Sequence, residues 1–507
     1  MKYKNIIKKT IITLIIVSFT GLGCGKDFLE IDSEGRINKQ EVQTNPNAAE
    51  ALVTGVYNSL YFGSFDPTTV GMLYMIATDI ASDDGDKGSF DADFGPAREI
   101  DNFTHTPGNF VFNNLWQGYY KGISRANSAL EALEGATFDA AVKNRLIGEV
   151  RFIRGMYYFN LVRLFGGVPK IIVVPKATEV NNAEFQTRAT REEIYEVIKS
   201  DLQFGIDNLP QKGEAGSVVG RSTKGAAQGL LAKVHLYQKN WQMAFDLSNA
   251  IITSGKYTLH PDYTTLWRET GNNNSESIFE VQTGLTGDCN AVSPLYSNSQ
   301  GPRAGGKRGW DDLGFGLNNP TANLVSAYEP GDKRRDATII FVQPTLPGGP
   351  NPGTMLYGNF RLPTQDSVEN QRYNYKAYHP AITTCGGNKD LKPKNIRILR
   401  YAEVLLINAE AAAMLNNAQG AARLNLVRAR AGLAPSATAT QADVWKERRV
   451  ELAMEQDRFL DLVRQGRAGT VLRAHGKAFV DGKHEVYPIP QAQIDLSGGL
   501  LKQNNGY

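Results

Sequence analysis

The 507-residue sequence is short of the residues that build metal centres. It contains three cysteines and six histidines, the histidines are scattered singly, and no C-x-x-C pair occurs. This pattern argues against a structural zinc site. A net excess of charge is also lacking, because 55 basic residues face 52 acidic ones. So small a surplus of positive charge does not indicate that the protein binds nucleic acid or an acidic surface.

Long apolar runs are equally scarce, and none after residue 24 is long enough to span a bilayer. The first 24 residues differ, because four lysines in MKYKNIIKKT precede the apolar run IITLIIVSFTGL, as in an export signal. The run ends at Gly21-Leu22-Gly23-Cys24, and small residues before a cysteine resemble a bacterial lipobox. We therefore predict a signal peptide over residues 1–23 and a lipid anchor on Cys24. The alternative is an ordinary signal peptide with an incidental cysteine.

Two further cysteines, Cys289 and Cys385, fall in irregular tracts. Outside the cytoplasm two such thiols can pair, but only if the backbone brings them close together. The sequence therefore leaves a disulfide open.

Amphipathic helical patterns are abundant, and they predict a mostly α protein. The composition, 41% hydrophobic and 21% charged, is ordinary for a globular body. The predicted helices span residues 45–61, 113–133, 140–165, 191–209, 222–238, 240–254, 395–415, 418–431 and 441–466. Helix pairs with short turns and small residues at the crossing are typical of tetratricopeptide-like units, although no fixed period of about 34 residues occurs.

Between the helix pairs lie long tracts with little periodicity, at residues 83–107, 284–320 and 344–363. Segments of this length without secondary structure are uncommon in compact domains and are often functional. We therefore expect one body over residues 24–507, and we expect its long irregular loops to form any ligand-binding face. The loop-rich part should lie at about 270–390.

The helix predicted over residues 140–165 is apolar nearly all round, so it should be buried on several sides. It also carries Glu149, Arg151, Arg154 and Arg163. Because buried charges are costly unless they are paired, neighbouring helices should supply partners for them.

Several segments together resemble one known family. In chain order they are CGKDFLE, EVRFIRGMYYFNLVRLFGGVP, TREEIYEVIKSDLQFGIDNLP, GRSTKGAAQGLLAKVHLYQKNWQMAFDLSNAIITSGKYTL, SIFEVQ, NIRILRYAEVLLINAEAAAML, LVRARAGL, ERRVELAMEQDRFLDLVRQGRA and YPIPQAQID. In this order and spacing they resemble the SusD/RagB family of Bacteroidetes outer-membrane lipoproteins, over nearly the whole chain after the lipobox. The resemblance implies a surface-exposed protein, lipid-anchored in the outer membrane, with a tetratricopeptide-like scaffold. It also implies that the protein binds a nutrient, usually an oligosaccharide, forms a lid on a SusC-type TonB-dependent transporter, and is not an enzyme.

The resemblance fits a structural role for the charges on the helices. The expected members of a buried network are Arg151, Arg154, Arg400, Glu403, Glu410, Glu447, Glu451, Glu455, Arg458 and Asp461. Alternatively, the acids at 447–461 could serve a glycan-cleaving enzyme, which needs two carboxylates flanking a cleft. Equal numbers of arginines beside these acids favour the structural interpretation.

Two motifs come close to ligand-binding patterns. GPRAGGKR at residues 301–308 lacks the hydroxyl that follows the lysine of a phosphate loop, so we expect a flexible loop that presents Arg303, Lys307 and Trp310. DIASDDGDKGSFDAD at residues 79–93 lacks the EF-hand spacing, yet some of its oxygens could hold calcium. The alternative is a solvated acidic loop, and no other cofactor is expected.

A sugar-binding site needs an aromatic platform beside groups that hydrogen-bond to hydroxyls. Three clusters in the irregular tracts meet this requirement. They are Trp310 with Asp311 and Asp312, Tyr296 with Asn290 and Asn298, and Phe90 or Phe94 with Asp83 and Arg98. Each aromatic residue could equally anchor its loop on the scaffold. A peptide ligand, or a scaffold that binds only another protein, are the alternatives that stay open.

Overall fold

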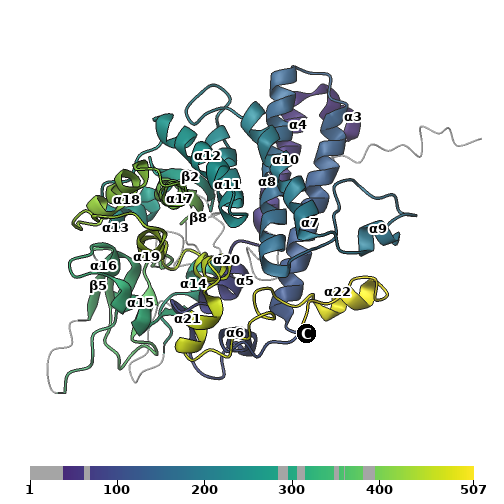
Figure 1. Cartoon of the computed structure of the whole chain (residues 1–507). Coiled ribbons are helices and arrows are strands. Elements are labelled where there is room, and N and C mark those ends of the chain that lie inside the picture. The colour runs from purple at the N-terminus through teal and green to yellow at the C-terminus, as the bar shows by residue number, and fades with distance from the viewer. Residues whose placement is uncertain are drawn as a thin grey trace, which may run out of the picture.

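The computed structural model describes residues 38–61, 69–283, 295–304, 314–347, 353–358, 360–380 and 394–507 (Figure 1). Helices dominate these residues, whose strands are short and form four two-stranded sheets. The prediction of a mostly α protein is thereby confirmed. The predicted signal peptide with Cys24, and also Cys289 and Cys385, lie outside the described residues. The anchor, the disulfide and the proposed domain boundaries therefore stay predictions.

A series of helices, most of them long, fills the upper part of Figure 1, and we call it the helical half. Its members are α3 (Lys39–Thr44), α4 (Pro46–Tyr57), α7 (Phe110–Glu134), α8 (Ala140–Phe165), α10 (Arg191–Asn208), α11 (Lys224–Tyr237), α12 (Trp241–Thr253), α17 (Tyr401–Met414) and α18 (Gln419–Arg430). From α7 to α18 each helix packs on the next, while α3 and α4 cover α7 and α8. This succession of helix pairs agrees with the predicted tetratricopeptide-like scaffold. Among the residues described, no helix has both the length and the apolar content needed to cross a membrane.

Local sequence signals begin the central helices of this series. Thr190 starts α10 with a capping box, in which its hydroxyl and the Glu193 carboxylate each accept a hydrogen bond from the other residue's backbone N–H. Asp139 caps α8 by accepting from two backbone amides of the first turn. The two helices approach closely, since a Cβ added at Gly155 of α8 would lie 3.4 Å from Leu202 of α10.

The helix predicted over residues 395–415 starts later than expected. Strand β8 (Ile396–Arg400) comes first and pairs with β2 (Ser277–Val281), and α17 follows directly. Every residue of β2 is buried, so its backbone groups need partners that water cannot supply. Strand β8 supplies them, and this requirement outweighs the helical pattern of the sequence.

The helix predicted over residues 441–466 is interrupted. It becomes α19 (Gln441–Glu451) and α20 (Arg458–Arg464), and Gln456 between them has a left-handed φ of 69°. The interruption directs the backbone N–H of Gln456 to the carboxylate of Asp79, at 2.9 Å. Such strain persists only where the surroundings fix it, and here a buried acid gains a hydrogen bond.

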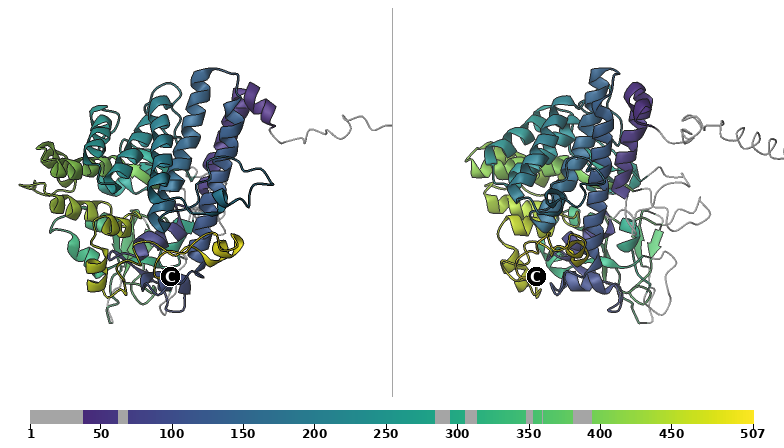
Figure 2. Two further views of the ribbon diagram at one scale, coloured as in Figure 1. Left: turned by 45° about the vertical axis from the view of Figure 1, so that its right-hand side comes forward. Right: turned by 90° about the vertical axis from the view of Figure 1, so that its right-hand side faces the viewer.

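The shorter elements lie mainly below the long helices in Figures 1 and 2. They are η1 (Asn58–Tyr61), α5 (Met72–Met75), η2 (Ile76–Ile80), β1 (Gly85–Gly88), α6 (Gly95–Asp101), α9 (Ala183–Gln186), α13 (Tyr263–Leu266), η3 (Glu269–Gly271), α14 (Leu295–Ser299), β3 (Leu317–Pro320), α15 (Ala322–Ala327), α16 (Arg334–Thr338), β4 (Ile339–Phe341), β5 (Thr354–Leu356), β6 (Phe360–Leu362), β7 (Arg372–Asn374), α21 (Ala468–Ala474) and α22 (Gln491–Leu496). We call the described residues of 69–101 and 295–380 the loop-bearing half. Within it β1 pairs with β3, β4 with β7 and β5 with β6.

Buried ion pairs hold the end of β8 to the chain around α19. Arg400 donates to Glu455 at 2.7 Å and pairs with Glu451, which also accepts from Arg334 and Arg430. Burial alone would raise the pKa of Glu451, but the three arginines hold it well below its usual value. The predicted structural network is confirmed around these residues.

A second cluster has the same character. It consists of Arg448 with Glu403 and Asp461, and of Arg464 with Glu410 and Asp461. The expected partnership of Arg154 with the α17 acids is wrong, because Arg154 donates to Asp201 of α10 at 2.8 Å. Arg151 lies 4.0 Å from the same carboxylate. Helix α10 packs along α8 and therefore supplies the nearest acid.

Candidate ligand-binding site

Three tracts that are distant in sequence meet in the loop-bearing half. The first contains β1, the second contains Ala304 and β3, and the third contains Val368. Strand β1 pairs with β3, and a bridge between Ala304 and Val368 joins the second tract to the third. Glycines allow this close packing. A Cβ at Gly88, where φ is 68°, would lie 2.4 Å from the Gly316 carbonyl oxygen. At Gly316, where φ is also 68°, a Cβ would lie 2.7 Å from that of Arg303.

Arg303 is the centre of a small polar and aromatic surface that this packing creates. Its guanidinium lies 5.2 Å from the centre of the Phe90 ring, and its Nε donates to Asp93 Oδ2 at 3.2 Å. The same carboxylate oxygen accepts from the Ser89 hydroxyl at 2.6 Å. The hydrogen bond from Ser89 and the neighbouring Arg303 lower the pKa of Asp93. The site therefore holds a half-buried aromatic ring beside a fixed cation and a fixed carboxylate.

Lys87 fixes the turn that carries Phe90 and Asp93. Its ammonium group is buried and donates to the backbone carbonyls of both residues at 2.7 Å. Asn370, from the third tract, accepts from the Ser89 backbone N–H at 3.1 Å through its side-chain oxygen. This bond leaves the amide nitrogen of Asn370 as a donor. We call Ser89, Phe90, Asp93, Arg303 and Asn370 the Phe90–Arg303 site; the exposed Phe315 directly precedes Gly316, which packs against Gly88 and Arg303.

Two predicted residues fall at or beside this site. Phe90 belongs to it, and Arg98 donates to the exposed Asp91 at 2.8 Å on the same surface turn. Phe94 packs its ring edge-on against Phe110 of α7, with centres 5.6 Å apart. This contact gives Phe94 an anchoring role.

Asp83 does not reach the surface, which corrects its place among the ligand candidates. It is 1% exposed and accepts from Arg458 at 2.8 and 2.9 Å, with Arg449 3.0 Å away. Burial opposes ionisation, but the hydrogen bonds from Arg458 and the charge of Arg449 hold the pKa of Asp83 at about 2. Its carboxylate therefore joins the loop-bearing half to α20.

The cluster around Tyr296 is only partly described. Tyr296 packs its ring against the main core, and burial raises the pKa of its hydroxyl. Asn298 is buried, and its backbone oxygen accepts from the N–H of Phe315 at 2.9 Å. Both positions favour a supporting role for these residues. Asn290 lies outside the described residues, as do Trp310, Asp311 and Asp312.

The chain leaves the Phe90–Arg303 site at Ala304 and returns to it at Gly314. Gly314 donates its N–H to Pro302 at 2.9 Å, and a Cβ at Gly314 would lie 2.3 Å from the backbone of Gly301. The predicted loop residues Trp310, Asp311 and Asp312 are thus joined to this site by the residues at both ends. Their contribution to a ligand stays a prediction.

The acidic tract at 79–93 has its carboxylates engaged by the protein. Asp84 accepts from Arg449 at 2.7 Å, and Asp86 lies 3.2 Å from His475. Burial raises the pKa of Asp79 to about 8. Within the described ranges no group of three or more histidine, cysteine, aspartate or glutamate side chains is arranged to hold a metal ion. Cation binding by Asp83, Asp84, Asp91 or Asp93 would have to displace an arginine partner.

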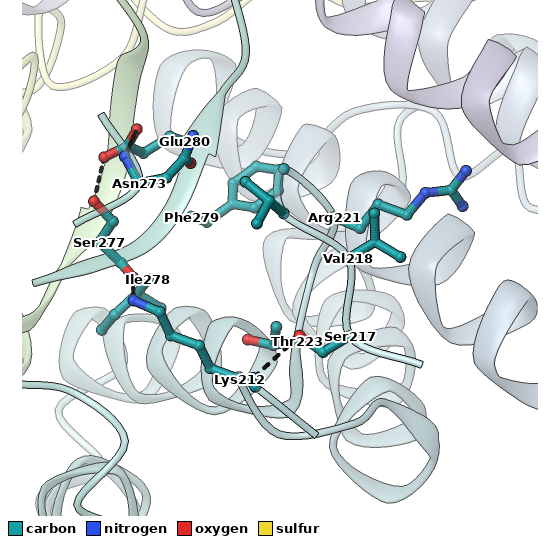
Figure 3. A pocket seen from close by; sticks show the side chains of 13 residues that line it. Lys212, Ser217, Val218, Arg221, Thr223, Asn273, Ser277, Ile278, Phe279 and Glu280 are labelled. Atoms are coloured by element: carbon teal, nitrogen blue, oxygen red, sulfur yellow. Dashed lines mark hydrogen bonds between the residues drawn. The ribbon is translucent and has the colours of Figure 1, made fainter. Parts of the chain in front are cut away.

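A pocket in the helical half lacks the features of a sugar site. It measures about 260 Å³ and lies between the α10–α11 connection and β2 (Figure 3). Its ammonium group, Lys212, donates to two backbone carbonyls at 2.8 and 3.0 Å, and the Arg221 side chain points away from it. Its aromatic residue, Phe279, is 3% exposed and so offers no platform. We therefore place the candidate site at Phe90 and Arg303.

Sequence reasoning missed Lys87, Phe315 and Asn370. Phe315, 43% exposed, sits among glycines and therefore belongs to the same signal that marked residues 284–320. Asn370 gave no signal, because it reaches Ser89 across 281 residues of sequence.

Comparison with known proteins assigns the chain to a family. A model described as starch-binding, associating with the outer membrane, matches residues 38–236, and the SusD family model matches residues 275–507. The chain belongs to the SusD family, whose members are non-catalytic. The resemblance read from the sequence is confirmed.

Relatives match over most of their length. A SusD-like protein of Bacteroides ovatus is 26% identical, covering 89% of this chain and 82% of the relative. Among solved structures, a laminarin binding SusD-like protein is 28% identical with a TM-score of 0.75, covering 91% of this chain and 99% of its own. Surface glycan-binding protein A from Bacteroides thetaiotaomicron, in complex with laminarihexaose, is 26% identical with a TM-score of 0.76, covering 91% and 100%.

Proposed function

We propose that this protein captures an oligosaccharide nutrient at the cell surface and delivers it to a SusC-type TonB-dependent transporter. The observation that carries the proposal is the ring of Phe90 held beside Arg303, Asp93 and Asn370. A pyranose has a weakly apolar face and a rim of hydroxyls, and this group of side chains offers a partner for each. The starch-binding description of the family and the laminarihexaose complex of a relative support the choice of ligand class.

Binding would need no bond cleavage and no cofactor. A sugar ring would pack on Phe90 or Phe315, its hydroxyls would accept from Arg303 and Asn370, and they would donate to Asp93. Because Arg303 and Asp93 are already paired, little side-chain entropy would be lost on binding. The predicted loop residues Trp310, Asp311, Asp312 and Asn290 would extend this surface.

Isothermal calorimetry of the chain from Gly25 onward tests the proposal. The titrants are laminarihexaose, maltohexaose and a mixture of defined peptides. We expect heat from at least one hexaose, and a loss of affinity of about tenfold or more in Phe90→Ala and Trp310→Ala. Leu496→Ala is the matched control, since this side chain is 77% exposed on α22.

The outcomes separate the alternatives. Peptide binding without sugar binding would assign the protein to peptide uptake. Unchanged affinity in Phe90→Ala would place the ligand elsewhere on the molecule. If no titrant produced heat of binding, the result would favour a scaffold whose partner is another protein.

Membrane attachment and delivery are tested separately. We propose that Cys24 is acylated and tethers the protein to the outer membrane, so Cys24→Ala should release it from the membrane fraction. Two acyl chains or more anchor a protein stably, since each buried CH₂ contributes about 0.8 kcal/mol. Purification of the tethered protein should recover a TonB-dependent transporter. Sugar binding without such a transporter would overturn the delivery step alone.

A further inference from the structure

A groove of about 590 Å³ lies on the loop-bearing half, next to the Phe90–Arg303 site. One wall follows the end of β4 and the residues after it, with Phe341, Val342 and Thr345. The other wall contains Gln365, Gln371 and Arg372. The volume falls within the range of about 300–1,000 Å³ that is usual for small-molecule sites. We call this feature the Phe341 groove.

The backbone of the groove is held firmly. Strands β4 and β7 place Phe341 opposite Arg372, and the N–H of Val342 donates to the Gln371 carbonyl at 2.9 Å. The N–H of Gln365 donates to Gln343 at 3.0 Å and so joins the two walls again. Beneath the sheet lies a separate small core that includes Ile340, Leu362 and Tyr373. The groove is therefore a preformed feature of the fold.

The side chains of the groove combine an aromatic ring with directed polar groups. Phe341 is half-buried, and the Arg335 guanidinium lies 5.5 Å from its ring centre. Gln365 donates through its amide nitrogen to the carbonyls of Val368 and Glu369, at 2.9 and 3.1 Å. This arrangement fixes its side-chain oxygen as an acceptor.

Two further groups supply donors. Arg372 donates through Nε to the Pro320 carbonyl at 2.7 Å, so the orientation of its guanidinium is set by β3. Its two outer nitrogens carry further N–H groups. Gln371 is exposed, and its carboxamide can both donate and accept. The groove thus repeats the chemistry of the Phe90–Arg303 site.

The two sites contain residues that are adjacent in the sequence. Asn370 belongs to the Phe90–Arg303 site, and Gln371 and Arg372 belong to the groove. Consecutive Cα atoms lie only about 3.8 Å apart. Strand β3, which Arg372 touches, also pairs with β1, whose next two residues are Ser89 and Phe90.

We infer that the Phe341 groove is an extension of the binding site and holds further sugar units of the same oligosaccharide. This inference rests on the proposed function. The aromatic ring takes the face of a pyranose, and the amides of Gln365 and Gln371 and the guanidinium of Arg372 take its hydroxyls. The ligand is therefore a chain of several sugars, too long for one site alone.

A second pocket, in the helical half, is lined by side chains of a different kind from those of the Phe341 groove. The pocket between α7 and α8, of about 410 Å³, is lined by aliphatic side chains such as Leu130 and Ile147 and by charged ones such as Glu131 and Arg151. No aromatic side chain lines it, and it therefore lacks a stacking platform for sugar. The Phe341 groove differs from it in the property that glycan binding needs.

The test compares oligosaccharides of two lengths. Affinities for laminarihexaose and laminaritriose, and for maltohexaose and maltotriose, are measured by calorimetry with the unaltered protein, Gln371→Ala and Phe341→Leu. We expect each substitution to weaken binding of the better hexaose by about threefold to tenfold, because one hydrogen bond or one ring contact is lost. Affinity for the corresponding triose should be unchanged.

Gln343→Ala is the matched control, because Gln343 is also an exposed glutamine next to the groove but is not among the residues that line it. Its hexaose affinity should match that of the unaltered protein. Equal hexaose affinity in all three variants overturns the extension and leaves the proposed function intact. An equal loss for hexaose and triose also overturns the extension, since the groove would then be the primary site. If the unaltered protein binds neither hexaose, the proposed function fails and the extension with it.

Discussion

The scaffold around α17, α19 and β8 and the Phe90–Arg303 site use charge in different ways. Around α17, α19 and β8, arginines and carboxylates are buried together, and Arg400 and Glu451 are each at most 2% exposed. In the loop-bearing half the pair of Arg303 and Asp93 is partly exposed, with about a third of each side chain accessible. Buried amides also pack within this half, where Asn318 and Asn374 both donate to Gln300 at 2.8 Å. Buried ion pairs fix the scaffold, whereas close backbone contacts fix the Phe90–Arg303 site and leave its surface side chains available.

The largest effect should follow removal of one charge from the scaffold. Glu451→Gln leaves Arg400, Arg430 and Arg334 without a common counter-ion in a buried site. We expect a loss of about 3–5 kcal/mol in the free energy of unfolding, measured by urea denaturation. A loss below about 1 kcal/mol would show that water or rearranged acids can replace Glu451, and the contrast between the scaffold and the site would fail.

A smaller effect is expected when the backbone packing of the loop-bearing half is disturbed. Gly316→Ala places a side chain at a left-handed φ and within 2.7 Å of Arg303 Cβ, which should cost about 2–3 kcal/mol. It should also weaken oligosaccharide binding, because Arg303 must move. Gly55→Ala is the matched control, since no atom lies within 4 Å of the added Cβ in α4, and it should stabilise the protein by about 0.5–1 kcal/mol. Unchanged sugar affinity in Gly316→Ala would separate Arg303 from the binding site.

Acid should weaken the fold before it affects the ligand site. Burial, with the nearby His484, lowers the pKa of His105 to about 3, while the unfolded chain has a pKa of about 6.5. As pH falls below about 6.5 the unfolded state takes up the proton first, so stability is lost progressively until about pH 3. At pH 5 this one histidine costs about 2 kcal/mol.

Urea denaturation at pH 7 and pH 5 checks this expectation. His105→Phe should lose about 2 kcal/mol less than the unaltered protein over the same interval, because phenylalanine does not titrate. Sugar affinity should stay constant between these pH values, since Ser89 and Arg303 keep Asp93 ionised. Equal acid sensitivity in both proteins would assign the loss to other groups.

The smallest effect is expected at an exposed ion pair. Arg335 and Asp336 have side chains that are 49% and 69% accessible, so solvent screens their attraction. Arg335→Ala should change the free energy of unfolding by less than about 0.5 kcal/mol in urea. A loss as large as that of Glu451→Gln would show that burial does not determine which pairs stabilise this protein.

Prediction from the sequence succeeded where the signal was local. The helical pattern gave α8 with its observed bounds, and the acidic first turn and the following proline gave α10 to within one residue. It failed where distant residues decide the outcome. Residues 396–400 form a strand because β2 needs a partner, and α19 ends at Glu451 because Gln456 turns to Asp79.

The candidate site shows the same limit. Phe90 and Arg303 were recognised by residue type within irregular tracts, but their contact depends on the pairing of β1 with β3. Asp83 was misplaced because composition cannot show that Arg458, 375 residues away, occupies its carboxylate. Asn370 could not be found at all without the bridge between Ala304 and Val368.

The close contact of Gly301 with Gly314 has a consequence for engineering. Gly314 is fixed by its hydrogen bond to Pro302 and by a contact with Gly301 that admits no side chain, and Ala304 is held by its bridge to Val368. The entropy of closing a loop grows slowly with its length, by about 0.6 kcal/mol for each doubling. Segments of other lengths and sequences can therefore be grafted between Ala304 and Gly314 at little cost in the free energy of unfolding. The fold offers a fixed frame on which libraries of loops could be selected for new carbohydrate specificities.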